Sequence, residues 1–323
     1  MPVKLGFIGF GIMGERLLRA ALAHDPASLV VSGIFDPSPT AAARLAAISA
    51  TPAAFASPAD VIAASDVLHI ASPPSSHLDY LMQCEEAGRA ALCEKPLATN
   101  VESAAEVVAE LVKRNARVGV NFPFASSLAV DQLEQWIAEG AVGTPASVAI
   151  EVAFAAWPRS WQRDAIAWLD GRADGGFTRE VVSHFLFLSR RMFGPLMLDQ
   201  ATCSYPEAGR SERAITARLQ AGSMPVTVAG SVGTTPKDDH NTWTLTGDKG
   251  RIRLRDWSFA EREVGGAWQQ APDALPNEKA RPLVLARQLD KVAALTRGEK
   301  TNLATLEDAF DVQRVVETVL KSS

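Results

Sequence analysis

Near its N-terminus the chain reads Val3-Lys4-Leu5-Gly6-Phe7-Ile8-Gly9-Phe10-Gly11-Ile12-Met13-Gly14. A short apolar run is followed by three spaced glycines, and residues 15–24 continue with helical spacing. Strand, tight glycine turn and helix in this order are typical of a dinucleotide-binding fold. Gly9 allows the turn, Gly11 lets the backbone approach a pyrophosphate, and Gly14 lets the helix pack close to the strand. We predict that residues Gly9, Phe10, Gly11, Ile12, Met13 and Gly14 bind the cofactor, with the helix N-terminus facing the anion.

A second feature distinguishes this pattern from an ordinary strand-turn-helix. The apolar run Leu29–Phe35 ends in Asp36, which lies 22 residues after Gly14. An acid about 20 residues beyond the glycines commonly binds the adenosine ribose. Asp36 is followed by Pro37-Ser38-Pro39, with no adjacent Arg or Lys, so its carboxylate would repel a 2′-phosphate. The sequence therefore predicts NAD as the cofactor, with NADP less favoured.

Composition excludes several classes of protein. The chain has 323 residues, of which 47% are hydrophobic, and a formal net charge of -5. This length suits two domains, and the charge does not indicate nucleic-acid binding. The apolar stretches are too short to span a membrane, and no signal peptide is recognisable. Three cysteines without metal-like spacing predict reduced core thiols and no metal site, as in a cytoplasmic protein.

The first 121 residues alternate between predicted strands and helices. Strands are expected at 3–8, 29–35, 67–71, 90–93 and 117–120, and helices at 15–24, 38–47, 76–87 and 101–115. A further helix is expected to start at Ser57-Pro58-Ala59-Asp60, with Ser57 as N-cap and Pro58 at the first helical position. This alternation predicts a doubly wound parallel sheet with helices on both faces, in a dinucleotide-binding Rossmann domain of residues 1–121.

Polar residues follow three of these strands at the point where each ends. Ligands of such sheets lie beyond the carboxyl ends of the strands, so we predict that these residues line the cofactor site. They are Ser72, Pro73 and His77, then Glu94 and Lys95, then Asn121. A lysine that is partly desolvated beside the nicotinamide could exchange a proton with an alcohol or carbonyl oxygen. The alternative for Lys95 is an ordinary surface lysine.

These motifs together resemble the glucose–fructose oxidoreductase and inositol dehydrogenase family, often written Gfo/Idh/MocA. The resemblance is carried by Gly9-x-Gly11-x-x-Gly14, Ser72-Pro73-Pro74-x-x-His77, Glu94-Lys95-Pro96 and Asn121. It continues through Gly140-Ala-Val-Gly-Thr-Pro145, Gly175-Gly176 before His184, and Thr246-Gly-Asp-Lys-Gly250, so that it spans nearly the whole chain.

The resemblance implies a Rossmann domain followed by an α+β domain, residues 122–323, with an open, mainly antiparallel sheet that binds substrate and forms oligomers. It implies a nicotinamide cofactor and hydride transfer at a carbinol carbon of a sugar or cyclitol. It implies Lys95 and His184 as catalytic residues. Such sheets commonly form dimers, so we expect a homodimer or homotetramer.

The second half supports this architecture independently. Alternating apolar residues predict half-buried strands near 148–154, 215–219, 226–228, 243–245 and 252–254, with a hairpin at 247–250. The charged run Asp256–Glu263 predicts a solvated loop, and residues 281–297 and 305–320 predict closing helices. The remaining histidines, His24, His69 and His240, have no motif and are interpreted as structural.

An apolar helix is predicted at Thr178–Met192. Glu180 and His184 are four residues apart and would share one face. The functional interpretation is a catalytic imidazole oriented by Glu180. The alternative is a partly buried histidine paired with a local acid.

Two positions depart from the usual pattern of the family. Glu180 stands where Asp is usual, and Phe122-Pro123-Phe124 replaces a frequent polar residue after Asn121. Both departures favour a substrate with fewer hydroxyl groups than a typical sugar. One loop-like stretch is rich in tryptophan and arginine. We expect part of it either to line the substrate site or to cover the sheet. Its residues are Trp157, Trp161 and Trp168, with Arg159, Arg163 and Arg172.

The leading hypothesis is an NAD-dependent dehydrogenase or reductase acting on a small polyol, sugar, cyclitol or related cyclic alcohol. Lys95 would shuttle the proton, His184 would orient the same oxygen, and Glu180 would tune His184. Two alternatives remain open: a non-catalytic NAD-binding regulator, and an NAD-dependent glycosidase of the same fold.

Overall fold

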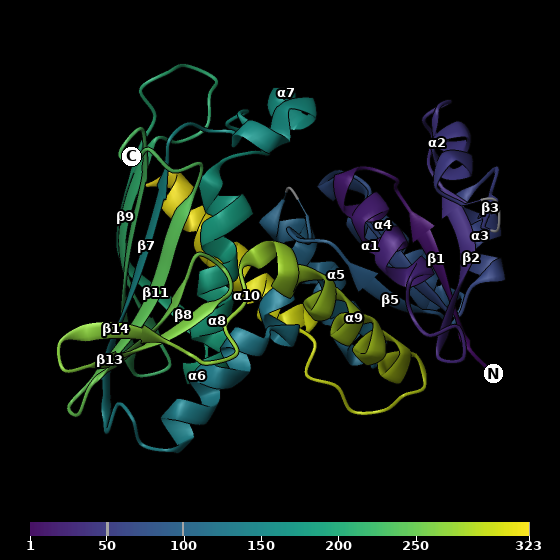
Figure 1. Cartoon of the computed structure of the whole chain (residues 1–323). Coiled ribbons are helices and arrows are strands. Elements are labelled where there is room, and N and C mark those ends of the chain that lie inside the picture. The colour runs from purple at the N-terminus through teal and green to yellow at the C-terminus, as the bar shows by residue number, and fades with distance from the viewer. Residues whose placement is uncertain (50–51, 99, 323) are drawn as a thin grey trace. The chain divides into compact units, whose positions relative to one another are not determined.

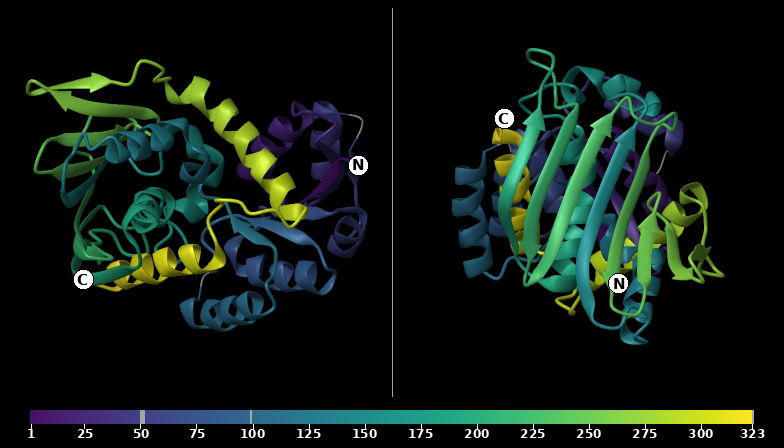
Figure 2. Two further views of the ribbon diagram at one scale, coloured as in Figure 1. Left: turned by 90° about the horizontal axis from the view of Figure 1, so that it is seen from below. Right: turned by 90° about the vertical axis from the view of Figure 1, so that its left-hand side faces the viewer.

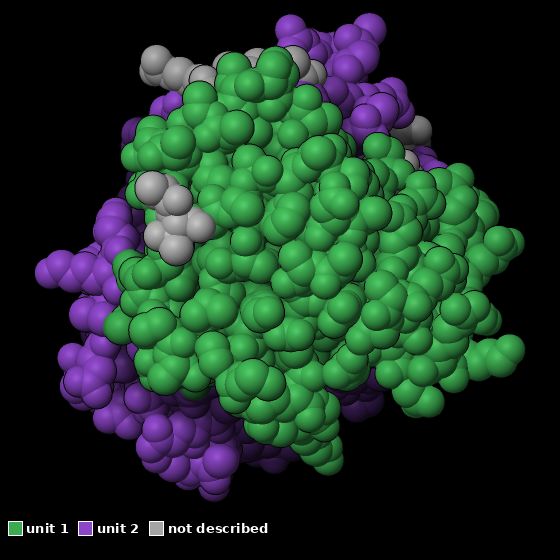
Figure 3. All heavy atoms as spheres, turned by 90° about the vertical axis from the view of Figure 1, so that its right-hand side faces the viewer, with its two compact units in different colours: residues 1–126, 282–310 green, residues 127–281, 311–323 purple. Residues whose placement is uncertain are grey.

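The computed structural model describes residues 1–49, 52–98 and 100–322. The chain forms two compact units, coloured separately in Figure 3. Unit 1 consists of residues 1–126 and 282–310, and unit 2 of residues 127–281 and 311–323. The first break lies close to the predicted boundary at 121/122. The return of residues 282–310 to unit 1 differs from the prediction, which assigned them to the second domain.

The sheet of unit 1 is entirely parallel, with strand order β3-β2-β1-β4-β5-β6. This confirms the predicted Rossmann sheet. The strands are β1 (Val3–Ile8), β2 (Leu29–Phe35), β3 (Ala53–Ala54), β4 (Val67–Ile70), β5 (Ala90–Cys93) and β6 (Val118–Val120). Strands β4 and β5 are buried along their whole length, as expected for a parallel sheet covered on both faces. The strand order reverses between β1 and β4, where such sheets bind ligands.

Some helices of unit 1 begin at a side-chain cap and others do not. The helices of unit 1 are α1 (Ile12–Leu22), α2 (Ala41–Ile48), α3 (Pro58–Ala64), α4 (His77–Glu86), α5 (Val101–Lys113) and two short 3-10 turns, η1 (Pro74–Ser76) and η2 (Pro123–Ser126). Ser57 caps α3 by accepting a hydrogen bond from the Asp60 N–H, and Pro58 occupies the first helical position, as predicted. Asn100 caps α5 in the same way.

Helix α9 (Asn277–Thr296) explains why the chain returns to unit 1 (Figure 1). Leu285, Leu289 and Val292 on this helix belong to the same buried cluster as the strand residues Leu5 and Phe7. These side chains complete the core of the first unit, although they come late in the sequence.

The sheet of unit 2 has the strand order β14-β13-β12-β11-β7-β10-β9-β8. Only the pair β7–β10 is parallel, so the predicted, mainly antiparallel sheet is confirmed. The strands are β7 (Pro145–Phe154), β8 (Leu196–Ser204), β9 (Ala214–Ala221), β10 (Met224–Val232), β11 (His240–Gly247), β12 (Arg251–Arg255), β13 (Phe259–Val264) and β14 (Ala267–Gln270). The right-hand view of Figure 2 looks onto this sheet. The predicted hairpin joins β11 to β12 through a hydrogen bond between Gly247 and Gly250.

The prediction of a solvated loop at Asp256–Glu263 is wrong. Phe259 begins β13, and Glu261 on that strand is only 3% exposed. Its carboxylate pairs with Arg253 and Arg255 on the neighbouring strand β12. Charges that are neutralised across a pair of strands look the same in sequence as charges that face water.

The helices of unit 2 are α6 (Leu128–Ala138), the 3-10 segment η3 (Ser160–Ala165), α7 (Ile166–Leu169), α8 (Ser183–Phe193) and α10 (Leu306–Lys321), whose first residues belong to unit 1. The predicted helix Thr178–Met192 is present, but its first turn, η4 (Thr178–Val182), is a π-helix. Such turns are rare in proteins overall, and many of those that occur lie at functional sites. Cys84, Cys93 and Cys203 are buried free thiols, as predicted.

Candidate active site

The glycine turn follows β1 and has the backbone that its sequence predicts. Gly9 has a φ of +96°, and a Cβ there would lie 2.5 Å from the Ala71 carbonyl. The Gly9 N–H donates to the Phe35 carbonyl at 2.8 Å, which ties the turn to the end of β2. A Cβ on Gly14 would collide with the Gly9 carbonyl oxygen. Neither position can hold a larger residue without moving the turn.

Gly11 differs from the other two glycines because its open side faces no atom. A Cβ built there meets nothing within 4 Å in the part of the chain that the structure describes. Gly11 also precedes α1, and no described side chain caps the first N–H groups of that helix. Open space beside uncapped N–H groups fits the pyrophosphate of a dinucleotide.

Asp36 stands directly after β2 and holds the glycine turn. Its Oδ2 accepts a hydrogen bond from the Phe10 N–H at 2.6 Å, and its Oδ1 accepts one from the Ser38 N–H at 2.8 Å. Each carboxylate oxygen can accept a second hydrogen bond, so the side chain can also bind ribose hydroxyls. Asp36 therefore has a structural contact that the sequence did not predict, beside its predicted binding role.

Arg44, on α2, is a cation near the glycine turn that sequence reasoning missed. Its guanidinium lies 4.8 Å from the centre of the Phe10 ring and pairs with Glu15 at 2.9 Å. Hydrogen bonds from Arg44 and Arg19 lower the pKa of Glu15. The residues next to Asp36 include no cation, whereas α2 brings Arg44 back to the turn from eight positions further along the chain.

His77, predicted to contact cofactor, is 1% exposed and contacts two backbone carbonyls. Its Nε2 lies 2.8 Å from the Ser72 oxygen and its Nδ1 lies 2.8 Å from the Pro96 oxygen. Burial disfavours the charged ring and lowers the pKa of His77, although both carbonyl contacts act in the opposite direction. The neutral ring donates to one carbonyl at a time. His77 thus links the loops that follow β4 and β5.

Glu94 is the centre of a buried polar chain across three strand ends. Its Oε1 accepts hydrogen bonds from His69 Nε2 at 3.0 Å and from Asn121 Nδ2 at 2.5 Å. The Asn121 Oδ1 accepts in turn from Gln288 Nε2 at 2.6 Å, on α9. Burial alone would raise the pKa of Glu94, but the hydrogen bonds from His69 and Asn121 and the nearby Lys95 charge outweigh it and lower that pKa. The carboxylate directly before Lys95 is therefore ionised and fixed.

Lys95 is half-buried in the loop that follows β5. Because all six strands of unit 1 are parallel, the residues that follow β1, β2, β4, β5 and β6 share one edge of the sheet. The structure thus brings to one edge every residue of unit 1 that the sequence assigned to the site. Lys95 has Glu94 on one side and the His77 contact to Pro96 on the other.

His184 belongs to unit 2 and lies in the first turn of α8, where it is 8% exposed. Glu180 lies in the preceding π-turn, so the shared face expected from regular α-helical spacing spans a change of helix type. The role of Glu180 stays a prediction.

The start of this helix is anchored by buried ion pairs. Arg179, 9% exposed, donates to both carboxylate oxygens of Glu317 at 2.6 and 2.8 Å and to the Gly175 carbonyl at 2.6 Å. The Thr178 N–H donates to Glu212, whose pKa is raised by burial. These contacts fix the backbone immediately before His184.

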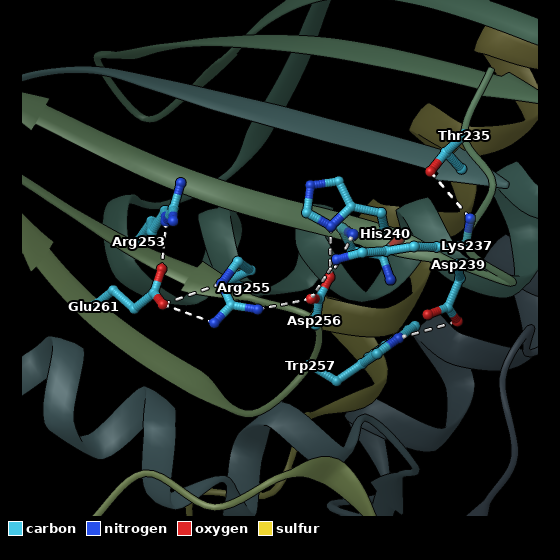
Figure 4. A network of polar contacts seen from close by, with 10 residues as sticks. Thr235, Lys237, Asp239, His240, Arg253, Arg255, Asp256, Trp257 and Glu261 are labelled. Carbon is cyan, nitrogen blue, oxygen red and sulfur yellow. Dashed lines mark hydrogen bonds and ion pairs between the residues drawn. The ribbon is translucent and has the colours of Figure 1, made fainter. Parts of the chain in front are cut away.

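Trp257 is a second residue that the sequence missed, in the run interpreted as solvated loop. Its ring centre lies 5.4 Å from that of His184, with 77° between the planes. Its indole N–H points to Asp239 at 3.4 Å (Figure 4). Asp239 also pairs with Arg159 at 2.8 Å.

The three tryptophans of the stretch that was expected to line the substrate site or cover the sheet differ in burial. Trp157 is buried and donates from its indole nitrogen to the Leu169 carbonyl, while Trp161 and Trp168 are 48% and 46% exposed. Arg159 lies over the Trp161 ring at 4.8 Å, and Arg172 lies over Tyr205 at 3.9 Å. The side chain of Arg163 lies outside the described residues.

The departure at Phe122-Pro123-Phe124 forms the start of a 3-10 turn, η2. Both phenylalanines are buried, at 3% and 4% exposure. Their rings occupy the interior, so the change replaces a polar group by core packing.

Residues 3–122 match the family described as GFO_IDH_MocA, an oxidoreductase family with an NAD-binding Rossmann fold. Inositol 2-dehydrogenase 3 of Saccharopolyspora erythraea is 32% identical over 151 residues, which are 45% of this chain and 43% of that protein. Inositol 2-dehydrogenase 1 of Mycolicibacterium vanbaalenii is 36% identical over 121 residues, 36% of this chain and 34% of that protein. The matched part thus spans less than half the length of these curated relatives.

Solved structures share the fold over the whole chain. An oxidoreductase of Thermotoga maritima superposes with a TM-score of 0.83 at 17% identity, covering 100% of this chain and 97% of the other. An Agrobacterium radiobacter oxidoreductase, solved with NAD+, L-tartaric acid and magnesium, gives 0.82 at 17% identity, covering 100% and 96%. At these identities the likeness concerns the fold.

In residues 1–49, 52–98 and 100–322, no helix combines the length and apolarity that crossing a membrane needs. The same residues contain no group of three or more His, Cys, Asp or Glu placed to hold a metal ion.

Proposed function

Because the chain belongs to the Gfo/Idh/MocA family of NAD-binding Rossmann oxidoreductases, we propose that it is an NAD-dependent dehydrogenase or reductase. Its proposed substrate is a small polyol, sugar, cyclitol or related cyclic alcohol, and hydride moves between the nicotinamide and a carbinol or carbonyl carbon. The inositol dehydrogenases among the relatives support this substrate class.

One observation carries the proposal: an open glycine turn and a half-buried lysine lie at the same edge of one parallel sheet. The turn, with Gly11 open and Asp36 beside it, fits a dinucleotide. Lys95 follows β5, which lies next to β4, and the strand order reverses between β4 and β1. Carbinol oxidation needs a proton acceptor near the cofactor, and Lys95 is the candidate.

NAD, when bound, supplies the hydride acceptor or donor. In the oxidative direction, the Lys95 amine takes the hydroxyl proton while the carbinol C–H bond breaks, which leaves a ketone and an ammonium. In the reductive direction Lys95 returns that proton to the new alkoxide. For His184 we propose a hydrogen bond to the substrate oxygen, and for Glu180 the orientation of the imidazole. Glu94 keeps a fixed negative charge directly before Lys95.

NAD rather than NADP is proposed because the Asp36 carboxylate would repel a 2′-phosphate. The two hydrogen bonds that Asp36 already accepts hold that carboxylate in place. A location in the cytoplasm stays a prediction.

We also propose a homodimer or homotetramer formed through the sheet of unit 2. Exposed residues alternate along β7 and β10, where Glu151, Thr227 and Ala229 share one face of the sheet. Light scattering should give a molar mass of two or four times the 34.5 kDa of one chain. A monomer at micromolar concentration would contradict this part of the proposal.

The test of the activity uses purified protein, NAD or NADP, and a panel of cyclitols, sugars, linear polyols and hydroxy acids. Formation of reduced nicotinamide is followed by absorbance, and cofactor binding is measured separately by fluorescence. Turnover of a cyclitol or sugar that depends on Lys95 supports the proposal. Tight NAD binding without turnover on any member of the panel would favour the non-catalytic regulator instead.

A further inference from the structure

The turn between β12 and β13 has an unusual backbone. Asp256 has a φ of 45° and Trp257 a φ of 71°, so two consecutive residues other than glycine adopt the left-handed region. Glycine or asparagine is usual there, and a bulky side chain at positive φ is an outlier. Such outliers persist where the surrounding structure forces them, and they gather at functional sites.

The first of the two residues is what holds the turn. The Asp256 carboxylate accepts a hydrogen bond from His240 Nδ1 at 2.8 Å and pairs with Arg255 at 2.8 Å and Lys237 at 3.7 Å (Figure 4). The Asn241 N–H also donates to it, at 3.2 Å. Burial would raise the pKa of Asp256, but these contacts outweigh it and lower that pKa. Four groups therefore fix the backbone from which Trp257 projects.

The second residue carries a large ring that the turn directs to the helix α8. The indole meets the imidazole of His184 edge to face, with ring centres 5.4 Å apart, and the Phe185 ring at 5.5 Å. Its N–H points to Asp239, whose carboxylate is held by the buried Arg159. Figure 4 shows Trp257 and Asp239 pointing toward one another. Both ends of the indole are thereby restrained.

We propose that Trp257 is a positioning residue for His184, and that the left-handed turn exists to present its ring. An imidazole in the first turn of a helix can rotate about two side-chain torsions, and an aromatic ring packed at its side restricts that rotation. The inference rests on the proposed function of His184, but the contact itself can be tested without turnover.

The experiment compares three variants of the full chain. Trp257→Gly removes the ring and also relieves the left-handed backbone, so loss of activity cannot be attributed to added backbone strain. Trp257→Phe keeps an aromatic ring at the same place. Trp268→Phe is the matched control. Trp268 lies on β14, and the guanidinium of Arg253 lies 4.1 Å from the centre of its ring.

For Trp257→Gly we expect kcat to fall by between about tenfold and about a hundredfold, as for a catalytic group displaced by about 1 Å, with the KM for NAD unchanged. Trp257→Phe should recover kcat to within about threefold, and Trp268→Phe should match the wild type.

Nuclear magnetic resonance provides the readout that a merely structural role would not move. The chain has 5 histidines, so their imidazole signals can be resolved, and a His184→Gln variant assigns the one of interest. Loss of the indole ring current shifts the His184 ring protons in any case, so the readout is the three-bond couplings that report the His184 side-chain torsion. We expect the His184 signals to show couplings averaged over several rotamers in Trp257→Gly and the wild-type couplings in Trp268→Phe.

The proposal is overturned if the His184 couplings are the same in Trp257→Gly and wild type, or if Trp257→Gly retains the wild-type kcat. If the wild type turns over no substrate, the proposed function fails, while the resonance comparison still decides whether Trp257 positions His184.

Discussion

The surroundings of Lys95 and of His184 are built in different ways. Lys95 lies in a loop whose neighbours are held by polar contacts among strand ends, through Glu94 and His77. His184 lies on a helix beside aromatic rings, and Trp257 reaches it from a turn far along the chain. The comparison teaches that a parallel sheet delivers polar residues to one edge by topology alone. An aromatic environment must instead be assembled from separate elements.

The largest effect should follow from removing the amine. Lys95→Ala is expected to lower kcat by about 10²–10⁴, the range for a lost general acid or base. Steady-state rates with the best substrate of the panel measure it. Lys113→Ala, on the exposed end of α5, is the control and should leave kcat unchanged. A small loss in Lys95→Ala beside a large loss in His184→Ala would reverse the roles assigned to the two regions.

A smaller but still large effect concerns the anchoring of the helix that carries His184. Arg179→Ala leaves the Glu317 carboxylate, only 13% exposed, without its ion-pair partner, so we expect the free energy of unfolding to fall by roughly 3–5 kcal/mol. Urea unfolding followed by circular dichroism measures it. Arg314→Ala breaks a pair with Asp311 in which the arginine is 51% exposed, and it should cost no more than about 1 kcal/mol. Equal losses in both variants would mean that the buried pair has no special weight.

The polar chain around Lys95 should respond to pH. Glu94→Gln is expected to lower the free energy of unfolding at neutral pH by roughly 1–3 kcal/mol, because a buried charged acceptor is lost. The folded-state pKa of Glu94 is below its ordinary value, so its contribution is complete above about pH 4.5 and is lost as the pH falls through the folded-state pKa.

The pH dependence separates this role from simple packing. Wild-type stability should therefore decline more steeply in acid than that of Glu94→Gln, as thermal unfolding at several pH values would record. Glu139→Gln, at the exposed end of α6, is the control. Parallel curves for wild type and Glu94→Gln would show that folding leaves the pKa of Glu94 unchanged, against the expectation.

The smallest expected effect concerns cofactor choice. Asp36→Asn removes the charge that repels a 2′-phosphate, and the Arg44 cation lies near the same turn. We expect the ratio of kcat/KM for NADP to that for NAD to rise about tenfold, or about 1.4 kcal/mol. Adding Arg44→Ala should cancel most of that gain. An unchanged ratio in Asp36→Asn would remove Asp36 from cofactor selection.

The sequence predicts best what is local. The glycine turn, Asp36 and the loop of Glu94 and Lys95 each combine neighbouring residues with one strand end, so the parallel sheet and its edge could be predicted. The link between Glu94 and Asn121 follows from the order of the strands, which no single segment specifies.

What the sequence does not predict depends on partners that are distant in the chain. Glu261 looks solvated until Arg253 and Arg255 are known to lie beside it. The place of Trp257 could not be predicted from its neighbours in sequence. The conformation of its turn depends on contacts that His240 and Asn241 make to Asp256. The π-turn before His184 leaves the apolar spacing of the helix almost unaltered, so spacing alone could not predict it.

The return of residues 282–310 to the first unit has a consequence for biosynthesis. A ribosome that adds 5–20 residues per second needs roughly 10–40 s to proceed from residue 126 to residue 310. During that interval the nascent Rossmann sheet lacks the leucines of α9, and its apolar surface is open to chaperones and to neighbouring chains. Translation speed across the intervening codons would thus govern how much of the newly made polypeptide escapes aggregation.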